Sequence, residues 1–273
     1  MTTANVKPPA RAGAILAGSA AVWWFAAFLG QWAFFSYIVA FYGPATLAGN
    51  FAAWNKGKAG MFFRGYVPGD RAGNLAFGLH ALLAAYVAFG GALQLVPQLR
   101  NHAPALHRWN GRLFLATALG LSLTGLYMVW VRGVSESTRH SAIISLNAAL
   151  IIVFAGLALR SALRRDFAVH RRWALRTYVV ANGQWFFRVG LFAWIVGTIG
   201  LTGHPRYVNQ ALFVWDFGCY LVPLAIVEIY LRVKDGAGPR ARYVLAGALA
   251  VLTLLMGAGI AAFSAFTWKQ FLS

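Results

Sequence analysis

Seven long apolar runs occupy most of the chain and constrain its fold more than any other feature. A helix needs about 20 apolar residues to cross the hydrocarbon core of a bilayer. The runs that meet this length are Gly13 to Phe41, Gly73 to Val96, Leu113 to Val131, His140 to Leu159, Trp173 to Leu201, Tyr207 to Leu231 and Tyr243 to Trp268. Because lipid offers backbone groups no hydrogen-bond partner, such runs fold as helices. The sequence therefore predicts an all-α, polytopic integral membrane helix bundle of about seven transmembrane helices, with residues 1–273 forming a single domain.

Composition supports a membrane environment, since 60% of the residues are hydrophobic and only 11% are charged. A soluble domain of this length needs more charge to cover its surface. The formal net charge of +18 raises the question of nucleic-acid binding. However, the positive residues lie between apolar runs and form no single basic face, so we interpret them as topology signals and expect no nucleic-acid partner.

The connections between the runs predict the orientation of the chain. If the N-terminus is cytoplasmic, fifteen Lys and Arg residues lie on the inner side and eight on the outer side. Positive residues are enriched in cytoplasmic loops, so this count favours a cytoplasmic N-terminus. The outer loop from Tyr42 to Ala72 contains the segment FAAWNKGKAGMFFRGY, which we expect to lie along the outer interface.

Four histidines lie near the ends of predicted spans. His80 and His140 are expected toward the outer side, whereas His107 and His170 are expected at the inner side. A neutral imidazole nitrogen is a common axial ligand of haem iron, and facing helices can hold the macrocycle between them. The placement predicts two metal-ligating pairs, His80 with His140 and His107 with His170, for one or two haem b groups per chain.

Basic and small residues accompany these histidines. The arginines expected to hold haem propionates are Arg108, Arg112, Arg171, Arg172 and Arg176. The glycines that would either let helices approach closely or leave room for a flat cofactor are Gly90, Gly91, Gly120 and Gly125. A second interpretation stays open, because histidines beside arginine and tryptophan are also typical of membrane-interface anchors.

Arg188 lies near the middle of the fifth predicted span. A charged side chain in hydrocarbon is costly and normally faces the bundle interior with a partner. Counting residues along antiparallel spans favours Asp216 as this partner, with Glu228 nearer the inner side. The three residues predict a polar intramembrane site. A structural ion pair, a proton path, a quinone-polarising group and a substrate site all remain open.

Two segments open with a similar motif, HRWNGR from His107 and HRRWALR from His170. With QLVPQLRNHAPALHRWNGRLF from Gln94, VHRRWALRTY from Val169 and the downstream Arg188 and Glu228, they resemble DUF2306, a bacterial membrane protein family of unknown function. The matching positions are His80, Gln94, His107, Arg108, Trp109, Gly111, Arg112, His170, Trp173, Arg188 and Glu228. The resemblance covers roughly residues 73–232. It implies a multi-pass protein of the bacterial cytoplasmic (inner) membrane, but it implies no particular activity.

The arrangement of the histidines also looks like that of two-haem transmembrane b-type cytochromes. Our leading hypothesis is therefore transmembrane electron transfer, a membrane oxidoreductase role, between a quinone or soluble donor and a periplasmic acceptor. The alternative is a cofactor-free transporter, or a membrane-embedded binding or scaffold subunit, that uses Arg188, Asp216 and Glu228. Discontinuous helices around Arg188 would favour the alternative, and an open groove flanked by His80 and His140 would favour haem.

Overall fold

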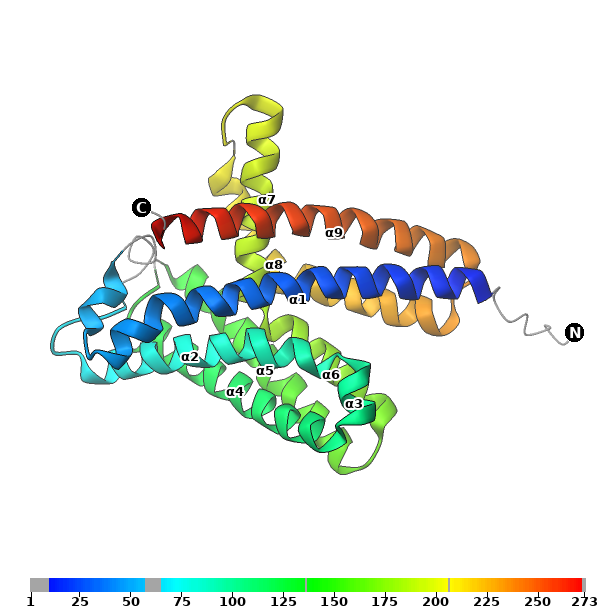
Figure 1. Cartoon of the computed structure of the whole chain (residues 1–273), viewed down its shortest axis with the longest axis horizontal. Coiled ribbons are helices and arrows are strands. Elements are labelled where there is room, and N and C mark those ends of the chain that lie inside the picture. Colours follow the sequence, from blue (N-terminus) through cyan, green and yellow to red (C-terminus); the bar gives the residue numbers. More distant parts are fainter. Residues whose placement is uncertain (1–9, 57–64, 136, 206, 272–273) are drawn as a thin grey trace, which may run out of the picture.

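The computed structural model describes residues 10–56, 65–135, 137–205 and 207–271. Within these residues the chain is helical and contains no β-strand (Figure 1). The long helices are α1 (Ala10–Leu47), α2 (Arg71–Gln94), α4 (Pro104–Trp130), α5 (Thr138–Leu163), α6 (Phe167–Ala181), α7 (Gly183–Thr202), α8 (Val208–Gly236) and α9 (Pro239–Trp268). The short ones are η1 (Phe51–Asn55), α3 (Pro97–His102) and η3 (Lys269–Phe271).

Seven of these helices are long and apolar enough to cross a membrane. They are α1, α2, α4, α5, α7, α8 and α9. The predicted all-α membrane bundle is thus confirmed. Helix α1 begins at one end of the long axis of the molecule and α9 finishes at the other, as an odd number of crossings requires (Figure 1).

The helices pack mainly as neighbours in a bundle. Helix α1 contacts both α2 and α9, α4 contacts α2 and α5, and α7 contacts α8 and α9. The largest buried cluster joins side chains from most of these helices, with the consecutive residues Tyr178, Val179 and Val180 of α6 among its most buried members. Helix α6 contacts α5, α8, α2 and α7, which explains why this short helix carries so much of the core.

The bundle has two ends, which we call the basic end and the loop end. The basic end carries Arg100, Arg108, Arg112, Arg164 and Arg171, which stand at the start or finish of α3, α4, α5 and α6. The loop end carries η1, the start of α2 and the finish of α9. In the predicted orientation the basic end faces the cytoplasm.

The predicted single span from Trp173 to Leu201 is wrong, because the structure divides it into α6 and α7 at Asn182. Helix α7 then runs across the direction of α1 and α9 (Figure 1). The next residue, Gly183, is tightly placed, since a Cβ there would lie 3.1 Å from Cβ of Tyr220. A bulkier residue at this position would push α8 away from the break.

The outer-loop segment FAAWNKGKAGMFFRGY falls partly outside the described residues, so its predicted interfacial position stays a prediction. Its first five residues form η1. The base of this loop is closed by Asn55, whose side-chain amide donates to the Tyr66 carbonyl at 2.7 Å and accepts from the Tyr66 N–H at 2.9 Å.

Candidate functional site

Arg188 lies in the second turn of α7, just beyond the break in the fifth span. One guanidinium nitrogen donates to the Gln184 carbonyl of the same helix at 2.6 Å. The guanidinium carbon is 5.4 Å from the ring centroid of Phe34 on α1. Its charge also acts on His80 of α2 and on Tyr42. Side chains of α1 and α2, two segments far from α7 in the sequence, therefore lie near one arginine.

The carboxylates of the described residues are engaged elsewhere. Asp216, the expected partner of Arg188, instead pairs with Arg139 at 3.2 Å, and its Oδ2 lies 4.0 Å from Nδ1 of His140. Glu228 pairs with Arg176 through two hydrogen bonds. The expected ion pair between Arg188 and Asp216 is therefore corrected. It was inferred from depth along two straight antiparallel helices, and the break removes that premise.

The other acidic side chains among the described residues have local roles. Asp70 binds Arg132, Asp166 accepts from the backbone N–H of Val169 at the start of α6, and Asp235 binds Arg172. Among the described residues, Arg188 thus has no carboxylate within ion-pair distance. An arginine in hydrocarbon without a counter-charge leaves a positive site inside the membrane.

Side-chain amides satisfy the backbone at the helix break. The Val180 carbonyl accepts from the Asn147 amide of α5 at 3.0 Å. The Asn182 amide donates back to the Tyr178 carbonyl at 2.8 Å. A broken helix in a membrane is stable only where neighbours rebind its freed backbone groups, so these two asparagines support the break. Both asparagines are thus part of the architecture around Arg188.

The two histidines of the predicted outer pair have separate surroundings. Nδ1 of His80 lies 3.0 Å from Oγ1 of Thr124. Because this hydroxyl donates to the Gly120 carbonyl, it accepts from Nδ1, and Nε2 of neutral His80 keeps its lone pair. His140 faces Asp216 instead. Within the described part of the chain no hydrogen bond joins His80 to His140.

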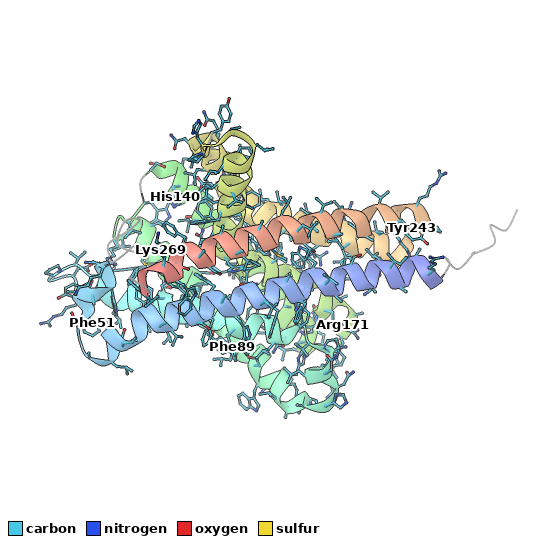
Figure 2. All side chains as sticks on the ribbon, turned by 45° about the horizontal axis from the view of Figure 1, so that its top comes forward. Phe51, Phe89, His140, Arg171, Tyr243 and Lys269 are labelled. Carbon is cyan, nitrogen blue, oxygen red and sulfur yellow. The ribbon has the colours of Figure 1, made fainter. Side chains whose placement is uncertain are left out.

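His107 and His170, the predicted inner pair, are arranged more like a ligand-binding site than the predicted outer pair is. The charge of His170 acts on His107. Nδ1 of His170 lies 2.9 Å from the Ala158 carbonyl and must donate to it, which leaves Nε2 of the neutral ring as an acceptor. Nδ1 of His107 is buried without a hydrogen-bond partner. In Figure 2, Arg171, the neighbour of His170, lies far from Lys269 along the molecule. His140, of the predicted outer pair, lies nearer to Lys269.

The arginines predicted to hold propionates fall into two groups. Arg172 and Arg176 are bound by Asp235 and Glu228. Arg108, Arg112 and Arg171 are exposed at the basic end. Only the second group is open to an external anion, so the predicted set of five is not a single cradle.

The glycines of α2 and α4 bring helices together. A Cβ on Gly91 would lie 2.7 Å from the Phe114 ring of α4, and one on Gly90 would lie 3.0 Å from Oδ1 of Asn110 on α4. One on Gly120 would lie 3.0 Å from Leu83, and one on Gly125 would lie 3.5 Å from His80. Side chains therefore fill the space that a flat cofactor would need at these positions. Of the two roles expected for the glycines, close helix approach is the one that the structure supports.

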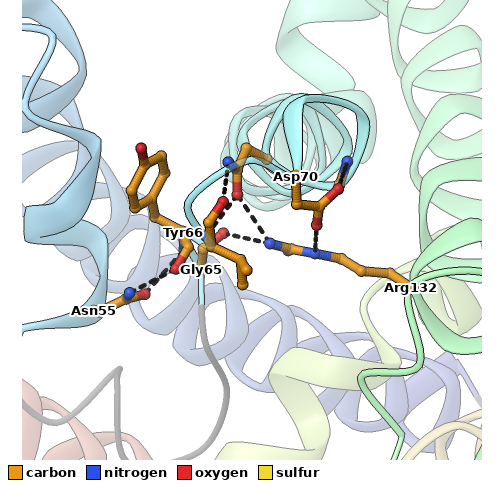
Figure 3. Close-up of polar contacts among 8 residues, drawn as sticks. Asn55, Gly65, Tyr66, Asp70 and Arg132 are labelled. Carbon is orange, nitrogen blue, oxygen red and sulfur yellow. Dashed lines mark hydrogen bonds and ion pairs between the residues drawn. The ribbon is translucent and has the colours of Figure 1, made fainter.

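A polar cluster at the loop end was not expected from the sequence (Figure 3). Arg132 follows α4 and is only 5% exposed. Its Nε donates to Asp70 at 2.8 Å, and NH2 donates to Asn74 at 3.0 Å and to the Gly65 carbonyl at 3.1 Å. The cluster fastens the start of α2 to the finish of α4. The one sequence signal was Asp70 immediately before a long apolar helix, a position typical of an N-cap.

Asp70 is the titratable member of this cluster. Its carboxylate accepts from the backbone N–H of Gly73 and binds the guanidinium of Arg132. These hydrogen bonds and the positive charge hold the pKa of Asp70 below its usual range. The cluster therefore keeps its negative charge under mildly acidic conditions.

Comparisons with known proteins give one family. No group of three or more His, Cys, Asp or Glu side chains suited to a metal ion occurs in the described part of the chain. No curated protein and no solved structure matches the chain, and the likeness to two-haem cytochromes gains no support. The family model described as "Predicted membrane protein (DUF2306)" matches residues 77–231, more than half of the sequence. This span contains both HRW openings and Arg188, and the chain belongs to the DUF2306 family of predicted membrane proteins.

Proposed function

We propose that this protein is a cofactor-free, membrane-embedded binding or transport protein whose site is centred on Arg188. One observation carries the proposal: Arg188 stands just after a broken helix and lacks a carboxylate partner among the described residues. Transporters commonly build substrate sites from discontinuous helices near the bilayer midplane, with half-helix N-termini directed at anionic groups. Helix α7 starts five residues before Arg188 and supplies such a terminus.

The neighbours of Arg188 indicate the kind of ligand. The Phe34 ring lies against the guanidinium, and Tyr42 and His80 are near enough to interact with its charge. This environment suits an apolar body that carries one negative group. The negative group would bind the guanidinium through charge-assisted hydrogen bonds. Asp216 and Glu228, predicted members of the site, pair with Arg139 and Arg176 and lie outside the site proposed here.

A pair of related probes tests this proposal. Decanoate should raise the thermal unfolding temperature of the purified protein in neutral detergent, and decanol, which lacks the charge, should not. Arg188→Gln should abolish the decanoate response. Arg139→Gln is the matched control, since it removes an arginine that Asp216 already neutralises. If Arg188→Gln protein responds to decanoate as strongly as the wild type does, the Arg188 site is wrong.

Haem binding at the basic end is the second candidate, because His107 has a buried, unpartnered Nδ1 and His170 lies within electrostatic range. In proteins that bind metals through histidine, the second ring nitrogen usually donates to a carbonyl or carboxylate, as Nδ1 of His170 does to Ala158. When bound, haem would supply one-electron chemistry for transfer to or from a quinone or another redox protein. His107 and His170 would ligate the iron, and exposed Arg108 and Arg171 would bind propionates.

Optical spectra decide this second candidate. Protein purified from cells supplied with haem precursor should show b-type bands after dithionite reduction, at about one haem per chain. His170→Ala should remove these bands, whereas His102→Ala, a change at an exposed histidine on α3, should keep them. A colourless wild-type protein would eliminate the haem candidate and leave the Arg188 proposal untouched.

A further inference from the structure

The first three turns of α4 form a basic and aromatic surface at the basic end, which we call the α4 opening. It consists of Arg108, Trp109 and Arg112 together with Leu106 and Leu113. Trp109 is 67% exposed, and Leu106 and Leu113 are 56% and 52% exposed. Because α4 is a membrane-spanning helix, this apolar surface faces lipid and not another part of the chain.

The arginines of the α4 opening are arranged for an anion. Arg108 and Arg112 are one helical turn apart and both are exposed. The Arg112 guanidinium stacks over the Trp109 ring at 4.9 Å from its centroid, which orients the planar group. None of the ion pairs among the described residues involves either arginine. The surface therefore carries two uncompensated positive charges.

The position of these charges indicates their partner. Exposed tryptophan at a helix end is typical of the headgroup level of a bilayer. Basic residues at that level attract anionic lipids, at about 1 kcal/mol per residue near the surface. Arginine matches the geometry of a phosphate group, and Leu106 and Leu113 lie where the acyl chains of the same molecule begin. Charge and apolar surface thus match the two parts of a phospholipid.

We propose that the α4 opening is a binding site for the phosphate headgroup of an anionic phospholipid, such as phosphatidylglycerol, in the leaflet at the basic end. Arg108 and Arg112 bind the phosphodiester, Trp109 orients Arg112, and the neighbouring leucines contact the acyl chains. The site is separate from the Arg188 site and does not depend on it.

The test uses the full-length protein in a neutral detergent with lipid added as mixed micelles. Phosphatidylglycerol should raise the unfolding temperature of the wild type, and phosphatidylcholine should not. The double variant Arg108→Gln/Arg112→Gln should need at least about tenfold more phosphatidylglycerol for half of the shift. Both residues are exposed, so we expect the variant to fold and to unfold at the wild-type temperature in phosphatidylcholine.

The matched control is Arg160→Gln/Arg164→Gln. These exposed arginines have the same spacing and lie at the same end, but they stand at the finish of α5 without a tryptophan between them. The control should respond to phosphatidylglycerol like the wild type. An equal loss in both double variants would mean that only total charge matters, which overturns the site. A shift of the wild type by inorganic phosphate alone would assign the surface to free phosphate instead of lipid.

Discussion

The segments that begin at His107 and His170, which we call the first and second HRW openings, have the same local geometry. They differ in whether a carboxylate pairs with the stacked arginine. Arg112 stacks over Trp109 at 4.9 Å, and Arg176 stacks over Trp173 at 4.5 Å, each three residues after its tryptophan. Arg176 is 15% exposed and also binds Glu228 of α8. Arg112 is exposed and has no such partner among the described residues.

This difference shows that the motif sets only the stacking, whereas the neighbouring helix sets the role. Helix α6 packs against α8, which supplies a carboxylate, so the second opening is a structural joint. The α4 opening faces lipid and keeps its charge for a ligand. A motif match alone would have given both copies the same function.

The largest expected effect is on the second opening. Arg176→Gln should lower the free energy of unfolding by about 1–2 kcal/mol, because it leaves partly buried Glu228 without its two hydrogen bonds. The estimate allows for solvent screening, since Glu228 is 33% exposed. Arg112→Gln should cost less than about 0.5 kcal/mol. Denaturation in detergent measures both, and equal losses would contradict the comparison.

A double-mutant cycle isolates the contact itself. Arg176→Gln/Glu228→Gln should be more stable than the sum of the two single changes predicts, by about 1 kcal/mol. The gain is expected because the double variant leaves no unpaired charge. Strictly additive losses would show that the two side chains are independent.

Adding a carboxylate to the α4 opening should make it resemble the second. Arg108→Glu places a glutamate four residues before Arg112, the favourable order for a helical ion pair. Stability should rise by about 0.2–0.5 kcal/mol, while the response to phosphatidylglycerol disappears. The comparison variant Arg108→Gln should keep part of the lipid response. Full lipid binding by Arg108→Glu protein would show that Arg112 needs no net positive surface.

Arg132, paired with Asp70, is a third arginine that can be compared with Arg112 and Arg176. Here the stability is measured as a function of pH. The folded-state pKa of Asp70 is lowered, so its contribution to stability is complete above the unfolded-state pKa and decreases as pH falls below about 4. We expect the wild type to lose slightly more thermal stability than Asp70→Asn protein between pH 5 and pH 3, in unfolding scans of both at each pH. Parallel curves would remove Asp70 as the titrating group.

Much of the architecture could be predicted because it depends on the length and hydropathy of continuous stretches of sequence. Seven apolar runs gave the membrane helices, and the HRW segments did mark two helix starts, at Pro104 and Phe167. These features need only length, hydropathy and local spacing. Whether histidines 80, 107, 140 and 170 bind haem remains a prediction.

The candidate site depends instead on contacts between residues that are far apart in the sequence. The short segment Asn182-Gly183-Gln184 lies between apolar residues, so hydropathy averaged over a whole span gave one continuous helix. The residue that fixes the break, Asn147, is 33 positions before the carbonyl that it binds. Similarly, Arg139 directly precedes the predicted span that begins at His140, and nothing local in the sequence links it to Asp216, 77 positions later.

The bond between Asn147 and the Val180 carbonyl also has a consequence for biogenesis. Helix α6 has 15 residues, fewer than the roughly 20 needed to cross a bilayer, so it cannot insert as an independent span. During synthesis Asn147 leaves the ribosome before the break does. We therefore expect α5 to enter the membrane before α6 and α7, so that the Asn147 amide can donate to the Val180 carbonyl when the break forms. In this order of synthesis, α5 assists the insertion of α6, the helix that is too short to cross the bilayer alone.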